Sequence, residues 1–137
     1  MEKLDNKKAS VTLKRKLLIR AFYKYQLMNA DLNYIKQELL DDNQEFGDED
    51  VIAESEAIVE HQDEIISEIK ANLSSKWNWN RIPAVIRAVL LVGAYEIKFT
   101  STPKPVTINE MVNYTKSVDP NFDFGFVNAA LDKIIKL

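Results

Sequence analysis

The sequence predicts an all-α protein that folds as one compact domain of about seven helices. Its 137 residues suit a single domain, and 46% of them are hydrophobic, which is enough for a core. Apolar residues recur three and four positions apart, the spacing of one helix face. Only three glycines and four prolines interrupt this pattern. Size, periodicity and sparse turn residues thus agree on a helical domain over residues 1–137, with a flexible basic leader at residues 1–9.

The N-terminal half predicts a long first helix and a short second one. The first carries an apolar stripe at helical spacing, formed by Leu13, Leu17, Leu18, Ala21, Phe22, Tyr25 and Met28. Asp31 can cap a short second helix with Ile35 and Leu39 on its apolar face. Residues 41–50 show no periodicity and are rich in acidic side chains, so we expect an acidic loop there.

A long helical stretch is expected over residues 51–73. Its apolar row weakens at Glu60–Asp63, where small and polar residues occupy it. We therefore expect a break at this point, with Asp63 capping a separate helix. Trp77 and Trp79 follow in a connector.

The last part of the chain predicts three helices. Pro83 suits the first turn of a helix that runs to about Lys98, and this helix is apolar on most faces, so we expect it at the centre of the core. Thr107 and Glu110 fit a capping box that begins a helix ending near Val118. After a turn, a C-terminal helix carries an apolar stripe of Phe126, Val127, Ala130, Leu131, Ile134 and Ile135.

The composition argues against catalysis and against a bound metal. There is no cysteine, which removes disulfides, thiolate metal sites and a cysteine nucleophile. The single histidine, His61, disfavours a zinc site and a Ser–His–Asp triad. No nucleophile–base pair and no phosphate-binding glycine loop is visible. We therefore expect no enzyme activity and no cofactor.

No segment of the sequence suggests export or membrane insertion. The polar N-terminus lacks the apolar core of a signal peptide. The longest apolar stretch, Ala88–Tyr95, is too short to cross a bilayer. We therefore expect a cytoplasmic protein with no membrane partner.

The net charge of −3 conceals an uneven distribution along the chain. Residues 1–30 carry eight Lys and Arg against two acidic residues, whereas residues 31–72 carry two against fourteen. Residues 73–137 are mildly basic, with eight against five. We expect one basic surface that attracts polyanions and one acidic surface that does not.

Five stretches of the sequence together resemble the NusB family. In chain order they are Ala21–Leu27, Val59–Ile65, Trp79–Ile97, Val106–Glu110 and Phe126–Asp132. Each match is weak alone, but five in the right order and spacing, over nearly the whole chain, are specific. The resemblance implies two small packed helical bundles.

The resemblance to NusB also implies a transcription antitermination factor. Such a protein binds the boxA element of ribosomal-RNA leader transcripts jointly with NusE, a small-subunit ribosomal protein. The pair joins elongating RNA polymerase and suppresses termination. Members of the family occur as monomers and as homodimers, and both states remain open for this chain.

The candidates for RNA contact are Lys7, Lys8, Lys14, Arg15, Lys16, Arg20, Tyr23, Arg87 and Phe126. The cations would neutralise phosphates, and Tyr23 and Phe126 would stack on unpaired bases. The alternatives are a solvated helix face for the cations, burial for the aromatic rings and a salt bridge for Arg87. The other polar residues of the resemblance are expected to cap and link helix ends: Glu96, Asn109, Glu110 and Asn128.

A second hypothesis is a protein-interaction module of the same fold that has lost specific RNA binding. The leader is poorer in arginine than is usual in the family, and arginine grips phosphate better than lysine does. Leu91 and Gly125 stand where the family often has Arg and Lys. This hypothesis predicts a protein partner whose capture does not depend on Lys14, Arg15 or Lys16.

Overall fold

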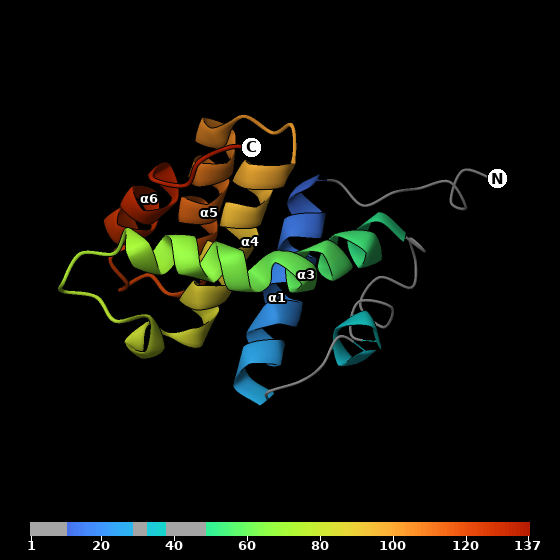
Figure 1. Cartoon of the computed structure of the whole chain (residues 1–137). Coiled ribbons are helices and arrows are strands. Elements are labelled where there is room, and N and C mark those ends of the chain that lie inside the picture. The colour runs from blue at the N-terminus through green and yellow to red at the C-terminus, as the bar shows by residue number, and fades with distance from the viewer. Residues whose placement is uncertain (1–10, 29–32, 38–48) are drawn as a thin grey trace. The chain divides into compact units, whose positions relative to one another are not determined.

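The computed structural model describes residues 11–28, 33–37 and 49–137, and these residues include no strand. They form α1 (Val11–Met28), α3 (Glu49–Ala71), the 3-10 turn η2 (Trp79–Arg81), α4 (Ala84–Phe99), α5 (Lys104–Val118) and α6 (Phe124–Asp132) (Figure 1). Residues 33–37 are also helical. The all-α prediction is confirmed. The predicted leader at residues 1–9, the cap at Asp31, Leu39 and most of the loop at 41–50 lie outside the described residues.

The chain divides into two compact units, Met1–Glu60 and His61–Leu137, as the two expected bundles require. In the first unit, α1, residues 33–37 and the first half of α3 each turn one face into a core. Among the described residues of this unit, the buried apolar side chains are Leu17, Leu18, Ile19, Ala21, Phe22, Ile35, Val51 and Ile58. An ion pair between Lys36 and Glu56 links the short helical segment to α3.

The predicted break at Glu60–Asp63 is wrong, because α3 runs through these residues without interruption. Ile58 and Ile65 are both buried and stand seven residues apart, so the apolar row of the helix continues across the polar stretch. Between them, His61 stacks on Phe99 with ring centroids 4.4 Å apart. The polar residues lie on the solvated side of one helix and do not end it.

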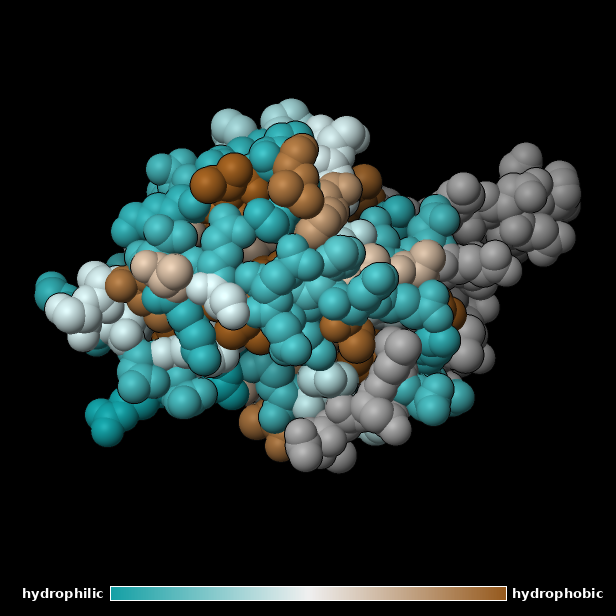
Figure 2. Space-filling view, in the orientation of Figure 1, coloured by the Kyte–Doolittle hydropathy of each residue, from teal (hydrophilic) through white to brown (hydrophobic). Residues whose placement is uncertain are grey.

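The outward face of α3 is hydrophilic, as Figure 2 shows where this helix crosses the view. Its exposed side chains include Glu56, Glu60, Asp63, Glu64, Ser67 and Lys70. Acidic residues outnumber basic ones among them. The acidic surface expected for residues 31–72 is therefore present on this helix.

In the second unit α4 is central, and it packs against both α5 and α6 (Figure 1). Every side-chain position from Ala88 to Lys98 is buried, which confirms the predicted core helix. Gly93 allows the close approach, because a Cβ there would lie 3.1 Å from side-chain atoms of Met111 and Leu131.

Among the described residues, no helix is long and apolar enough to cross a membrane.

The predicted capping box at Thr107 is wrong. α5 begins three residues earlier, at Lys104, with Pro103 before it and Pro105 in its first turn, where a missing N–H costs nothing. Thr107 is fully buried, and its hydroxyl donates a 2.6 Å hydrogen bond to Glu96 Oε2. Glu96 therefore links α4 to α5, as expected for a structural residue of the family resemblance.

An ion pair between the buried Lys98 and the half-buried Glu68 anchors the C-terminal residues 133–137 to α3 and α4. Lys98 Nζ lies 2.6 Å from Glu68 Oε1 and donates to the Ile135 carbonyl, while the Ile135 N–H donates to Glu68 Oε2. Burial raises the pKa of Glu68, but the hydrogen bonds from Lys98 and Ile135 and the Lys98 charge outweigh it, so the pKa lies below its usual value. The Ile135 side chain is 69% exposed, which corrects its place in the predicted stripe, because α6 already ends at Asp132.

Candidate nucleic-acid interface

One face of α1 combines exposed cations with an exposed aromatic ring. Lys16, Arg20 and Tyr23 stand four and three residues apart, so they project from the same side of the helix, which we call the α1 face. All three are exposed. Lys16 and Tyr23 make no side-chain hydrogen bond or ion pair with other residues in the described part of the chain. The α1 face can neutralise phosphates and offer a ring to a base.

Arg15 does not belong to the α1 face. Its exposed fraction is only 7%, and it stands three and four residues before the buried Leu18 and Ile19. That spacing places it on the core-facing row, where its aliphatic stem can pack. Lys14 is half-buried, and Lys7 and Lys8 lie outside the described residues. Of the predicted basic cluster, Lys16 and Arg20 are therefore the cations that reach the surface of α1.

Arg87 holds the connector between α3 and α4, which spans residues 72–83. Its Nη1 donates to the Ile82 carbonyl at 2.8 Å and to the Asn80 carbonyl at 3.4 Å. These carbonyls lie in and just after η2, so the guanidinium ties the connector to the first turn of α4. The side chain is half-buried. This geometry gives Arg87 a positioning role that the sequence did not reveal.

Phe126 is packed into an aromatic cluster with Trp77 and Phe122. Its ring stacks on the indole of Trp77 with centroids 3.9 Å apart and planes inclined by 24°, and it meets Phe122 edge-on at 6.0 Å. Phe126 is 8% exposed, whereas Trp77 is half-buried. The burial favours the core alternative for Phe126 and leaves Trp77 as the more accessible ring of the two.

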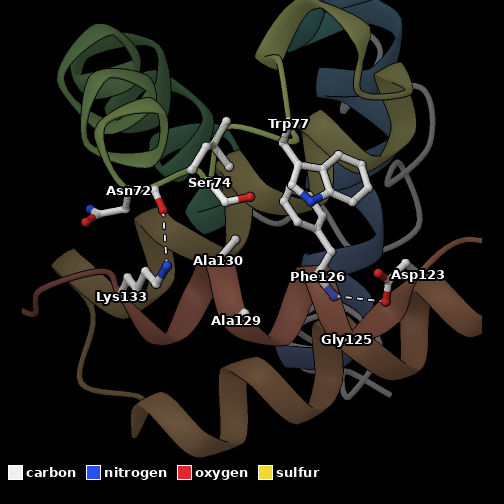
Figure 3. A pocket seen from close by; sticks show the side chains of 10 residues that line it. Asn72, Ser74, Trp77, Asp123, Gly125, Phe126, Ala129, Ala130 and Lys133 are labelled. Atoms are coloured by element: carbon white, nitrogen blue, oxygen red, sulfur yellow. Dashed lines mark hydrogen bonds between the residues drawn. The ribbon is translucent and has the colours of Figure 1, made fainter.

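A hollow of about 260 Å³ opens beside the aromatic cluster (Figure 3). Trp77 and Phe126 stand at one end, and Asn72 and Lys133 at the other. Lys133 Nζ donates to the Asn72 carbonyl at 3.2 Å, and Asp123 Oδ1 accepts the backbone N–H of Phe126 as the cap of α6. Of the charged groups that line this hollow, Lys133 thus ties α6 to the connector, and Asp123 caps the start of α6.

Two exposed cations of the connector, Lys76 and Arg81, are absent from the residues that the sequence singled out. They line a second hollow, of about 350 Å³, which also includes Trp77. A cation directly beside an aromatic residue, at Lys76 and Trp77, is the pattern that could have drawn attention to them.

Among the described residues, no group of three acidic or histidine side chains is placed to hold a metal ion.

Fold and surface together define a class: a small all-α protein of two helical units, with exposed cations near an exposed ring on α1 and near a half-buried ring on the connector. Such a surface suits a polyanionic partner. Known proteins that are similar to this chain in sequence and fold define its class more narrowly.

The sequence matches the NusB family over residues 12–136. The transcription antitermination protein NusB of a Nitratiruptor species is 31% identical over 128 residues, which cover 89% of this chain and 88% of that protein. The NusB protein of Helicobacter pylori is 30% identical over 131 residues, covering 93% and 94%. The solved structure of T. maritima NusB matches with a TM-score of 0.78 and 27% identity, covering 93% of this chain and 92% of that one. The chain belongs to the NusB family of transcription antitermination proteins.

Proposed function

We propose that this NusB-family protein binds boxA-type RNA of ribosomal leader transcripts together with NusE. The complex then joins elongating RNA polymerase and suppresses termination. The two units act as one RNA-binding domain over residues 1–137, and the protein works in the cytoplasm, where these transcripts are made. Family membership supports the proposal at the level of the pathway, and the α1 face supports it at the level of chemistry.

The α1 face is the observation that carries the proposal. Lys16 and Arg20 stand about one helical turn apart and can each neutralise a phosphate of an extended strand. Tyr23 follows on the same side with 37% of its surface exposed, so an unpaired base can stack on its ring. Stacking of this kind is worth about 1–3 kcal/mol per base. Charge and stacking together suit a single strand of RNA.

The test is fluorescence anisotropy with labelled boxA RNA at low salt, in the presence and absence of NusE, with a scrambled RNA as the control. We expect boxA RNA to bind more tightly than the scrambled strand, and more tightly still with NusE. Tyr23→Ala should weaken binding by about 5- to 150-fold, the equivalent of one stacked base. No binding to boxA RNA at low salt, with or without NusE, would contradict the proposal.

A protein-interaction module that has lost specific RNA binding is the second candidate function. The burial of Arg15 and Phe126 favours it, because two of the predicted RNA contacts are withdrawn from solvent. It predicts that NusE is captured equally well by the native protein and by a Lys16→Ala/Arg20→Ala variant, while boxA RNA adds nothing to the affinity. An affinity for NusE that rises with boxA RNA, and rises less in the variant, would exclude it.

A further inference from the structure

The connector between α3 and α4 carries positive charge that the protein does not use internally. Lys76 and Arg81 are both exposed, and within the described residues neither side chain makes an ion pair or a hydrogen bond. Together with Ser75, Trp77 and Asn78 they line a hollow of about 350 Å³, which we call the connector hollow. No acidic side chain is among these five.

Most other cations of the second unit have a partner there. Hydrogen bonds to backbone carbonyls or carboxylates engage Arg87, Lys98, Lys104, Lys133 and Lys136. Lys76 and Arg81 differ because they share one hollow with each other and with no counter-charge. Two like charges on one concave surface repel, and an anion placed between them would relieve that repulsion.

The connector hollow is also built on a fixed frame. The Arg81 N–H donates to the Asn78 carbonyl at 2.9 Å, and Asn78 Oδ1 accepts the Asn80 N–H at 2.9 Å. Trp79 is buried, and the indole of Trp77 is stacked on Phe126. The backbone that carries the two cations is therefore held in place before a ligand arrives, which lowers the ordering cost of binding.

Trp77 gives the hollow a second property, because its half-buried ring borders both the connector hollow and the hollow of Figure 3. Unpaired cations beside a partly accessible aromatic ring form the combination that single-stranded nucleic acids use, with phosphates on the cations and a base on the ring. We propose that the connector hollow is a second contact for the RNA, in which Lys76 and Arg81 hold a phosphate and the adjoining base lies against Trp77. This inference rests on the proposed function and adds to the α1 face a contact in the second unit.

The charge part of the proposal is tested by the salt dependence of boxA binding. In single-stranded RNA each phosphate contact contributes about 0.7 to the slope of log K against log salt, so Lys76→Ala/Arg81→Ala, which removes the one phosphate contact of the hollow, should flatten the slope by about 0.7. Lys70→Ala/Lys116→Ala removes the same charge from exposed positions outside the hollow and should leave the slope nearly unchanged. The charge-preserving variant Lys76→Arg/Arg81→Lys should keep the native slope.

The stacking part is tested by tryptophan fluorescence. Trp79 is only 9% exposed, so a base that quenches tryptophan emission should act mainly on Trp77. We expect boxA RNA to quench the emission of the native protein, and we expect Trp77→Phe to remove most of that quenching. Phenylalanine keeps an aromatic ring against Phe126, and a melting curve followed by circular dichroism confirms that each variant is folded.

The outcomes separate this inference from the proposed function. If the native protein does not bind boxA RNA at low salt with or without NusE, both fail. If it binds, but the Lys76→Ala/Arg81→Ala variant has the same slope as the charge-matched control, or if quenching survives Trp77→Phe, the inference fails while the proposed function stands. A flattened slope that the charge-preserving variant restores, with quenching that depends on Trp77, supports it.

Discussion

α1 and the places where helices meet in the second unit use the same kinds of residue in opposite ways. On α1, the cations Lys16 and Arg20 and the ring of Tyr23 face solvent. In the second unit, the ring of Phe126 and the charge of Lys98 are buried, one against Trp77 and the other against Glu68. An aromatic residue of the family resemblance, such as Phe126, is therefore not by itself a binding residue, and neither is a cation such as Lys98.

The difference follows from what surrounds each residue. Lys16 and Tyr23 project from the side of α1 opposite to its apolar row. Their exposure therefore costs little free energy, and they contribute little to the stability of the fold. Lys98 and Phe126 lie where helices meet, so the fold depends on them. Substitutions of Lys16 and Tyr23 should accordingly change RNA binding, and substitutions of Lys98 and Phe126 should change stability.

The largest expected effect on stability is that of Phe126→Ala, which is to be compared with Tyr23→Ala. Phe126→Ala should lower the free energy of unfolding by about 3–5 kcal/mol, because it leaves a cavity beside Trp77. Tyr23→Ala should change it by no more than about 0.5 kcal/mol, as a surface substitution does. Urea denaturation followed by circular dichroism measures both. Equal losses of unfolding free energy in the two variants would contradict the contrast between the exposed Tyr23 and the buried Phe126.

A smaller effect is expected for the buried hydrogen bond between α4 and α5. Thr107→Val removes the donor to Glu96 Oε2 and should cost about 1–3 kcal/mol of unfolding free energy, because it removes a hydrogen bond from a buried carboxylate. Thr115→Val is the matched control. Thr115 is equally buried, but its hydroxyl donates to Met111 O, a carbonyl of its own helix. A loss as large in the control would show that the Glu96 link is not special.

The pH dependence of stability should reveal the Glu68–Lys98 pair. The folded state holds the pKa of Glu68 below its ordinary value of 4.5, so the carboxylate stabilises the fold above about pH 4.5. This stabilisation is lost as the pH falls through the lowered folded-state pKa. Glu68→Gln should flatten the acid side of a plot of melting temperature against pH, whereas Asp63→Asn, exposed on the same helix, should leave it unchanged. Identical acid profiles for the native protein and Glu68→Gln would refute this.

Much of this architecture could be predicted from the sequence. The helical periodicity placed α1, α4 and α6 within a few residues, and the apolar faces of the helix expected from Pro83 to about Lys98 identified it as the core helix. The predicted helix boundaries were wrong where a local sequence signal competed with the burial of apolar side chains. A Thr-x-x-Glu pattern indicated a cap, but Thr107 lies inside α5 because two prolines start the helix earlier. A polar stretch indicated a break in α3, but its buried row continues from Ile58 to Ile65.

The candidate site could be predicted only in part. Arg15 stands on the same helical row as the buried Leu18, Ile19 and Phe22, so the spacing alone could have predicted that Arg15 is buried. Phe126 was likewise part of the apolar stripe of its own helix. By contrast, nothing in the sequence shows that Lys76 and Arg81 line one hollow, or that Arg87 bonds to the carbonyl of Ile82, because the folded connector creates those contacts.

The most direct test of the α1 face compares two lysines. Lys16 and Lys70 are both exposed on helices, and neither has an ion-pair partner among the described residues, so Lys16→Ala and Lys70→Ala remove the same charge at similar cost to stability. The measurement is the slope of log K against log salt for boxA RNA with the native protein and each variant. We predict that Lys16→Ala flattens the slope by about 0.7, one phosphate contact, and that Lys70→Ala, on the acidic face of α3, leaves it unchanged. Equal slopes for the two variants would contradict the assignment of RNA binding to the α1 face.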